Sequence, residues 1–242
     1  MDILTYSGVA EAAKARGHVV VIDVLRAFTV EACMFENGLE ACLLTDSRDQ
    51  ALEWKKRGLG SITLGEVSGL TFEETGFDLG NSPRDVLNLD LAGKTVIHRT
   101  SCGTSSICAA APRADKIYGC SFLTALSTVQ DTLADGAQTV SLIASGARGP
   151  KRHDEDEVCA IYLRSLLEGA TPDPDSVVAL ARGTRRYRKF AARAPEGDAE
   201  HDGEIAMRIN RCDFAIVVRT ETIGPGETAL VARAVHTPKA SS

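Results

Sequence analysis

The side chains best suited to chemistry follow directly on short apolar stretches of the sequence. Asp23 lies at the end of the predicted strand His18–Val24, Arg26 follows that strand, and Glu66 comes shortly after Ser61–Leu64. In an open α/β sheet, ligands bind beyond the carboxyl ends of the strands, so residues at such positions are candidates for one shared site. A carboxylate that interrupts an apolar strand is costly to bury unless it is paired or binds a metal. We therefore expect a functional role for Asp23, with helix capping as the alternative.

The turn after the apolar segment Lys94–His98 has the composition of an anion-binding site. It combines one arginine with three hydroxyl side chains and opens an alanine-rich helical segment. Backbone N–H groups at a helix start, together with hydroxyls and an arginine, supply hydrogen-bond donors and positive potential for phosphate oxygens. The residues of this turn that we expect to bind substrate are Arg99, Thr100, Ser101, Gly103 and Thr104.

Carboxylates make up most of the remaining candidates. Asp78 lies in the glycine-containing loop 76–83, and Asp156 lies in the acidic stretch 154–157 at the start of another predicted helix. Carboxylate oxygens suit Mg²⁺, whose coordination is usually completed by water and substrate phosphate. An acidic first turn can also simply complement the helix dipole. No His or Cys pair has zinc-finger spacing and no H-E-x-x-H sequence occurs, so the sequence offers no support for a soft-metal site.

Other phosphate-related motifs are absent. A cysteine phosphatase needs an arginine six residues after its nucleophile, but the residue six positions after Cys102 is Cys108. An aspartyl-phosphate phosphatase needs a second acid two residues after the first, and the residue in that position after Asp23 is Leu25. Neither a Walker A sequence nor a G-x-G-x-x-G sequence after a strand occurs. We therefore expect neither a Cys102 nucleophile nor a nucleotide-binding loop.

These candidates require a framework of alternating strands and helices. Apolar runs alternate with helical patterns from Asp2 to about Glu168, which is typical of α/β units. Several runs are apolar throughout, as expected of a sheet that is covered on both faces. Helix caps are predicted at Ser47 and Ser82, and a further helix over Gly203–Arg211. The predicted strands are His18–Val24, Ala41–Thr45, Ser61–Leu64, Lys94–His98, Lys116–Gly119, Thr139–Ala144 and Asp213–Val218.

The segment Thr171–Asp175 is the expected boundary between two lobes, because each of its prolines disfavours helix in the residue before it. We expect residues 1–170 to form the main α/β lobe and to carry most of the site. Residues 171–242 are expected to form a smaller C-terminal α/β lobe packed on it. An exposed seam between the lobes would allow a homodimer.

Composition and charge narrow the classes of function. The 242 residues include 27 Lys and Arg against 33 Asp and Glu, and the net charge of −6 argues against a surface that binds nucleic acid or an anionic membrane. The arginine-rich stretch 182–193 precedes an acidic one, so a solvated helix face is favoured over a nucleic-acid site. Seven cysteines without a C-x-x-C pair, and no recognisable signal peptide or membrane span, predict a cytoplasmic protein with reduced thiols.

Several strings of the sequence together resemble the 2-phosphosulfolactate phosphatase (ComB-like) family. The most specific are Asp23-Val-Leu-Arg26 and Gly76-Phe-Asp-Leu-Gly-Asn-Ser-Pro83, with support from the turn 99–104 and from Glu155-Asp156. The resemblance implies a three-layer α/β/α fold with a largely parallel or mixed sheet. It also implies a Mg²⁺-dependent phosphatase that removes phosphate from 2-phosphosulfolactate on the route to coenzyme M. At Cys102 and near Thr124 the chain lacks Asn residues that many relatives carry.

The resulting hypothesis is a Mg²⁺-dependent phosphatase acting on a small anionic 2-phospho acid. The expected catalytic residues are Asp23, Arg26 and Glu66, and the expected metal ligands are Asp23, Glu66 and Asp156. The expected substrate-binding residues are Asp78, Asn81, Ser82, Arg99, Thr100, Ser101, Gly103, Thr104, Ser121 and Arg148. Arg99 and Arg148 are the candidates for a sulfonate and a carboxylate, because arginine suits bidentate binding of such groups.

The attacking group, a metal-bound water or a carboxylate such as Asp23, is left open by the sequence. The alternatives to a phosphatase are a divergent protein that binds a phosphorylated metabolite without hydrolysing it, and an esterase or transferase that reuses the pocket. A nucleic-acid role ranks last.

Overall fold

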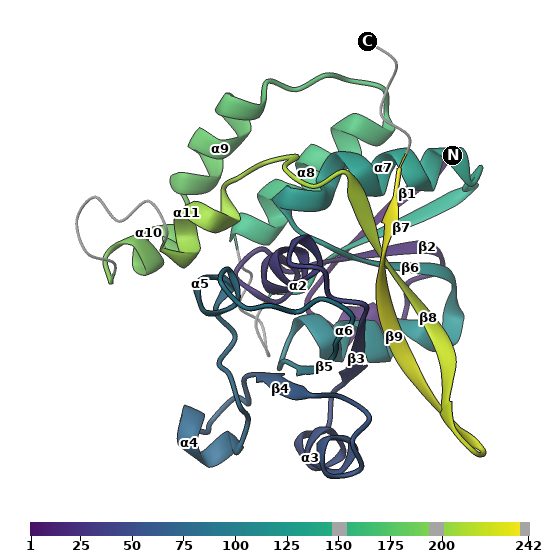
Figure 1. The fold of residues 1–242 in the computed structure, drawn as a ribbon. Helices are drawn as coiled ribbons and strands as arrows, with labels where there is room; N and C mark the ends of the chain where they lie inside the picture. Colours follow the sequence, from purple (N-terminus) through teal and green to yellow (C-terminus); the bar gives the residue numbers. More distant parts are fainter. Residues whose placement is uncertain (147–153, 194–200, 238–242) are drawn as a thin grey trace.

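The computed structural model describes residues 1–146, 154–193 and 201–237 of the chain (Figure 1). Within these ranges the strands form one nine-stranded sheet in the order β1-β7-β2-β6-β8-β9-β3-β5-β4. Two groups of parallel strands stand on either side of an antiparallel hairpin. The first group is β1 (Asp2–Ser7), β7 (Thr139–Ala144), β2 (Gly17–Ile22) and β6 (Ala114–Cys120). The second is β3 (Ala41–Thr45), β5 (Thr95–Arg99) and β4 (Ile62–Gly65), and the hairpin is β8 (Phe214–Gly224) and β9 (Glu227–His236).

Helices cover both faces of the sheet, as the apolar strands require. Between the two parallel groups lie α1 (Val9–Ala12), α2 (Ala27–Glu36) and α6 (Gly103–Ala110), and α6 contacts strands of both groups (Figure 1). The opposite face of the first group is covered by α7 (Ala125–Ala134), α8 (Asp154–Leu167), α9 (Pro174–Arg182), α10 (Arg185–Ala191) and α11 (Asp202–Ala206). The opposite face of the second group is covered by α3 (Arg48–Lys56). The short helices are α4 (Phe72–Thr75), α5 (Pro83–Val86), η1 (Ala111–Arg113) and η2 (Phe122–Thr124). This arrangement confirms the predicted α/β/α class with a largely parallel sheet.

The hydrophobic core follows the same layers. One cluster fills the space between the two parallel groups and includes Val21 of β2, Phe28 of α2, Leu44 of β3 and Ile107 of α6. Two smaller clusters lie under the outer helices. Gly119 of β6 lets α2 approach the sheet, because a Cβ there would lie 2.4 Å from the Phe28 ring. The helix α2, which follows Asp23, is therefore packed tightly against β6.

The predicted strands correspond closely to the observed ones, and two observed strands were not predicted. Residues 41–45 and 139–144 form strands with the predicted bounds. β1 is an edge strand with no fully buried residue, and in β9 the buried residues are Ala229, Val231 and Ala232, so neither strand is buried along its length like the central strands. The predicted helix over 203–211 ends at Ala206 in the structure.

Of the two predicted caps, one forms the expected hydrogen bond and the other does not. The Ser47 side chain accepts from the Gln50 N–H at the start of α3. Ser82 stands at the N-cap position of α5, but its hydroxyl donates instead to Asp202, 2.8 Å away. This hydrogen bond joins Asp202, in the C-terminal part of the chain, to the loop 76–83.

The C-terminal segment shares the sheet with the rest of the chain. β8 pairs with β6 and β9 pairs with β3, so strands from residues 171–242 lie in the middle of the sheet rather than beside it. The seven cysteines, all within the described ranges, are free thiols. In the described parts of the chain, no helix combines the length and the apolarity needed to cross a membrane.

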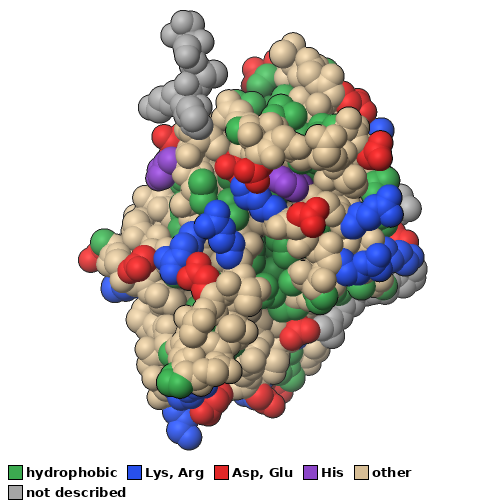
Figure 2. Space-filling model, turned by 90° about the vertical axis from the view of Figure 1, so that its right-hand side faces the viewer, with side chains coloured by type: hydrophobic (Ala, Val, Ile, Leu, Met, Phe, Trp, Pro, Cys, Tyr) green, Lys and Arg blue, Asp and Glu red, His purple; other side chains and the backbone are tan. Residues whose placement is uncertain are grey.

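Figure 2 shows one face of the molecule, on which Lys and Arg side chains lie beside Asp and Glu side chains. On this face the positive charges do not merge into a continuous basic surface (Figure 2). Such a surface is the usual electrostatic footprint of a nucleic-acid-binding protein.

Candidate active site

Asp23 is the first residue after β2 and lies in the interior. Its N–H donates to the Cys120 carbonyl, 3.1 Å away, and its Oδ1 accepts from the Ala27 N–H at the start of α2, also at 3.1 Å. The side chain is 6% exposed. Burial raises the pKa of this carboxyl, with a contribution from Glu66, while the Ala27 hydrogen bond and the charges of Arg186 and His98 oppose the increase. Asp23 therefore has one carboxylate oxygen engaged in the local structure and lies among several other charges.

The turn at the start of α6 is in direct contact with Asp23. A Cβ built on Gly103 would lie 2.9 Å from Asp23 Oδ2 and 2.6 Å from the Ala27 Cβ. These separations leave no room for a side chain, so glycine is required for this close approach. The two regions singled out in the sequence, the end of β2 and the turn 99–104, thus meet at one point of the structure.

The hydroxyls of the turn build the turn itself. Thr100 and Thr104 bond each other, since the Thr100 N–H donates to Thr104 Oγ1 at 2.7 Å and the Thr104 N–H donates to Thr100 Oγ1 at 3.0 Å. Glu66 accepts from the Ser101 N–H at 2.7 Å and from the Ser101 hydroxyl at 3.2 Å. The turn is therefore held rigidly by its own side chains and by Glu66.

Arg99 is buried, and its guanidinium helps to hold the same turn in place. Its guanidinium donates to the backbone carbonyls of Asp46 and Glu66, at 3.1 and 2.6 Å, and to Ser101 Oγ. These bonds join the ends of β3, β4 and β5. The sequence predicted that Arg99 binds a substrate anion, and that role stays a prediction; within the protein its guanidinium bonds two backbone carbonyls and the Ser101 hydroxyl.

The first turn of α8 contributes two further buried carboxyl groups, Glu155 and Asp156. Asp156 Oδ1 accepts from the Val24 N–H at 2.8 Å and Oδ2 accepts from the Gly146 N–H at 3.1 Å, so this side chain links the ends of β2 and β7. Glu155 is also fully buried. Burial raises the pKa of Glu155 to about 8 and raises that of Asp156 well above its usual range, and the charge of Asp23 adds to both increases.

Two buried serine hydroxyls lie on either side of Asp23, at the carboxyl ends of β6 and β7. Ile22 pairs with Cys120 of β6 and with Ala144 of β7, so Asp23, Ser121 and Ser145 occupy the next position in three adjacent strands. Residues in register project from the same face of a sheet. Both serines are fully buried, and neither hydroxyl has a hydrogen-bond partner among the described residues. Unpaired buried polar groups of this kind are costly, and a bound polar ligand or ion would satisfy them.

Arg26 is fixed by the C-terminal part of the chain. Its Nη1 donates to Asp202 Oδ2 at 2.5 Å, and Asp202 Oδ1 also accepts from the Ser82 hydroxyl at 2.8 Å. The guanidinium carbon lies 5.3 Å from the centre of the Phe190 ring, and that of Arg186 lies 5.0 Å from the same ring. Phe190 is therefore in cation–π range of two arginines at the site.

Some of the predicted site residues do not join this group. Asp78 is exposed and accepts from Lys55 at 2.7 Å and from the Thr63 N–H at 2.6 Å. Partial burial raises its pKa, but the bonds from Lys55 and Thr63 and the Lys55 charge together lower it. Asn81 is buried beside His98, with 3.3 Å between its Oδ1 and His98 Nε2. Arg148 lies outside the described residues. The members that the structure does gather at the end of β2 are Asp23, Gly103, Ser121 and Asp156.

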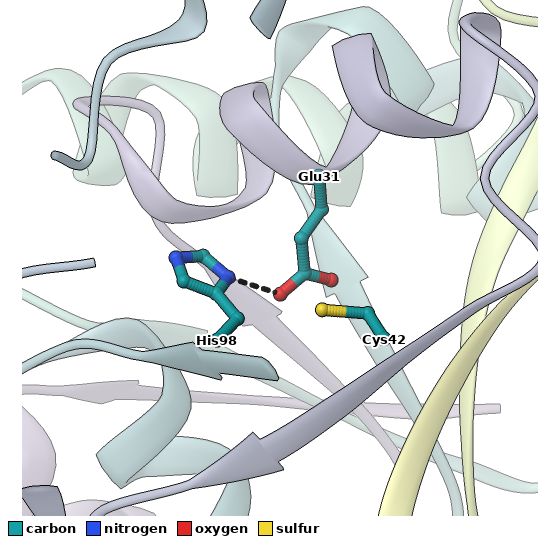
Figure 3. Close-up of side chains that lie close together, drawn as sticks. All are labelled: Glu31, Cys42 and His98. Atoms are coloured by element: carbon teal, nitrogen blue, oxygen red, sulfur yellow. Dashed lines mark hydrogen bonds and ion pairs between the residues drawn. The ribbon is translucent and has the colours of Figure 1, made fainter. Parts of the chain in front are cut away.

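The sequence did not indicate a buried group formed by Glu31, Cys42 and His98 (Figure 3). It is the one place, within the described ranges, where ligand atoms of three such side chains all lie within 4.8 Å of one another. Glu31 Oε1 lies 2.8 Å from His98 Nδ1, which is a hydrogen-bond distance. Thiolate and imidazole are ligands for zinc-type ions rather than for Mg²⁺. The three residues come from α2, β3 and β5, so no short spacing could have predicted them.

Arg186 and Asp202 were also missed as site residues. The sequence indicated a solvated helix face for the arginine-rich stretch, and most of it is exposed. Arg186 precedes Phe190 by four residues, a spacing that places two side chains on one helix face. This spacing was the signal available in the sequence, but nothing indicated that the face would turn toward Asp23.

Comparisons with known proteins agree on one family. A family model described as 2-phosphosulpholactate phosphatase matches residues 3–197. A protein of Thermus thermophilus named as a probable 2-phosphosulfolactate phosphatase is 34% identical over 166 residues, covering 67% of this chain and 68% of its own. Proteins with the same name from Bacillus subtilis and Thermotoga petrophila are 29% and 35% identical. These alignments cover 83% and 79% of this chain, and 86% and 78% of the relatives.

Proposed function

The chain belongs to the 2-phosphosulfolactate phosphatase family, and from this premise we propose that it hydrolyses the phosphomonoester of 2-phosphosulfolactate with Mg²⁺ as its cofactor. The observation that carries the proposal is the contact between Asp23 and the first residue of α6. It brings a buried carboxylate and a helix N-terminus to the same point, which is what binding of a cation and a phosphoryl group together requires.

The donors around Asp23 fit a hard cation. Asp23 and Asp156 offer carboxylate oxygens, and Ser121 and Ser145 offer hydroxyl oxygens without partners among the described residues. Mg²⁺ usually keeps several waters and needs only one or two protein carboxylates, so three tightly converged protein ligands are not required. We propose that Asp23 and Asp156 hold the ion, and that Glu66 braces the turn through Ser101. When bound, Mg²⁺ would offset negative charge on the phosphoryl oxygens.

Binding of the phosphoryl oxygens and protonation of the leaving group are assigned to groups of the protein itself. The N-terminal turn of α6 and Arg26, held by Asp202, bind the phosphoryl oxygens on which negative charge develops. Hydrolysis consumes one water, whose oxygen ends on phosphorus while the bond from phosphorus to the substrate alkoxide oxygen breaks. Glu155, whose pKa burial raises to about 8, holds a proton near neutral pH and gives it to that leaving oxygen. The buried setting of Asp23, Glu155 and Asp156 keeps water away from these charges and strengthens their interactions.

Phosphate release from 2-phosphosulfolactate, measured with and without Mg²⁺, tests this proposal. We expect hydrolysis by the wild type with Mg²⁺ and its loss on chelation. Asp23→Asn should abolish turnover with an unchanged circular dichroism spectrum. Asp78→Asn, an exposed carboxylate bonded to Lys55, is the matched control and should retain activity. Binding of the substrate without phosphate release would instead support a non-hydrolytic binder.

The cellular setting follows from the same resemblance. We propose a cytoplasmic enzyme, in keeping with seven free thiols, on a route to coenzyme M. The homodimer remains a prediction, which size-exclusion chromatography with light scattering will test.

A further inference from the structure

Arg186 differs from the other arginines around the site in having a buried nitrogen that no described residue hydrogen-bonds. Its Nε is buried and has no hydrogen-bond partner within the described residues. Glu155 Oε1 lies 3.9 Å from that nitrogen, which is an ion-pair separation but beyond hydrogen-bonding distance. A guanidinium placed in this way can donate to a ligand oxygen without first breaking a hydrogen bond of its Nε.

Of the neighbouring arginines, Arg26 is assigned above to the phosphoryl oxygens, and Arg99 holds the turn at the start of α6. Arg26 is bonded to Asp202 at 2.5 Å, and Arg99 is bonded to the backbone carbonyls of Asp46 and Glu66. The oxyanions of a substrate with three acidic groups need more than one cation. Of these three arginines, Arg186 is the one with a buried Nε that no described residue hydrogen-bonds.

The position of Arg186 indicates which part of a substrate it would meet. Its side chain is 32% exposed, whereas that of Glu155 beside it is fully buried. The Phe190 ring, 5.0 Å from the guanidinium carbon, supports it on α10. Arg186 therefore stands at the outer rim of the buried carboxylate group, where the part of the substrate that does not react would lie.

We propose that Arg186 binds the second anionic group of the substrate, a carboxylate or a sulfonate, and so selects 2-phospho acids over simple phosphate monoesters. Its planar fork of N–H donors matches two oxygens of either group. The assignment rests on the proposed function for the reaction. With Arg186 in this role, α10, in the C-terminal part of the chain, forms one wall of the active site.

Steady-state kinetics of three variants test the assignment. Arg186→Ala removes the cation and Arg186→Lys keeps the charge but not the bidentate fork. Arg185→Ala, at an exposed position on the same helix, is the matched control. The substrates are 2-phosphosulfolactate, 2-phosphoglycolate and p-nitrophenyl phosphate, the last of which has no second anionic group.

We expect Arg186→Ala to raise KM for the two 2-phospho acids by about 10- to 100-fold, the range for losing a charge-assisted hydrogen bond, with little change in kcat. The same variant should affect p-nitrophenyl phosphate hydrolysis much less, because this substrate has no second anionic group and Arg186 then acts only through its charge on Asp23 and Glu155. Arg186→Lys should fall between the wild type and Arg186→Ala, and Arg185→Ala should match the wild type.

Three results would overturn the assignment. They are an unchanged KM in Arg186→Ala, an equal loss on p-nitrophenyl phosphate, and a wild type that does not prefer 2-phospho acids over the aryl phosphate. A wild type that prefers 2-phosphoglycolate but does not hydrolyse 2-phosphosulfolactate would contradict the substrate named above. The role of Arg186 would then be decided on 2-phosphoglycolate with the same variants.

Discussion

Replacing Glu155 by glutamine should remove the part of the pH dependence of stability that this carboxyl contributes to the metal-free protein, alongside the parts from Asp23 and Asp156. Burial is the main reason that the pKa of Glu155 rises to about 8 from its ordinary value of 4.5. The charges of Asp23 and Asp154 add to the increase, and Arg186 opposes it. Glutamine has the shape of the protonated acid but carries no proton to lose, so the variant keeps the folded structure and loses the titration.

The direction and size of the expected change in the free energy of unfolding with pH follow from the linkage between protonation and folding. Below pH 4.5 the Glu155 carboxyl is protonated in both states, and its contribution to stability is fully present. As the pH rises toward and through about 8, the unfolded chain releases the proton first, so unfolding becomes more favourable. At 1.36 kcal/mol per pH unit, the interval from 4.5 to about 8 corresponds to a loss of about 5 kcal/mol.

Urea unfolding in the presence of EDTA, at about pH 5 and about pH 8.5, measures this effect. The wild type should lose several kcal/mol more than Glu155→Gln between the two conditions. Asp154→Asn, an equal change of charge at an exposed position in the same turn, should retain most of the wild-type dependence. A Glu155→Gln variant with the wild-type slope would refute the raised pKa and the role of Glu155 as a proton donor.

Three further predictions concern other parts of the structure. Gly103→Ala should lower the free energy of unfolding by about 1–3 kcal/mol and reduce activity, because its Cβ would lie 2.6 Å from the Ala27 Cβ; urea titration and phosphate release check this. Asp202→Asn should lower kcat/KM about 10-fold by weakening the charge-assisted bond that fixes Arg26, and unchanged kinetics would contradict it. Burial raises the pKa of Cys33 and Cys108 to about 12, so neither should react with iodoacetamide at pH 8 unless the protein unfolds, as mass spectrometry will show.

Local sequence patterns predicted the elements that carry the site. Residues 41–45 and 139–144 form buried strands with the predicted bounds, and both segments are largely apolar. Asp23 was recognisable because a carboxylate at the end of such a run needs a partner. Its meeting with Gly103 followed from the rule that ligands collect beyond the carboxyl ends of strands.

The parts that the sequence did not predict depend on pairing between distant segments. The insertion of β8 and β9 between β6 and β3 is decided by the whole sheet, not by any local pattern. It brings the C-terminal helices against β2, where Arg186 and Asp202 reach the site. A surface arginine and a site arginine have the same local sequence signal, so only the tertiary contacts distinguish them.

The central claim is that Asp23, Asp156 and the start of α6 form one centre for a divalent cation and a phosphoryl group. Anomalous diffraction from crystals of the protein with Mn²⁺ and orthovanadate tests it most directly. The account predicts an anomalous peak in contact with Asp23 and Asp156, with the vanadate against the Gly103 N-terminal turn. A peak at Glu31, Cys42 and His98, with no ion beside Asp23, would contradict it.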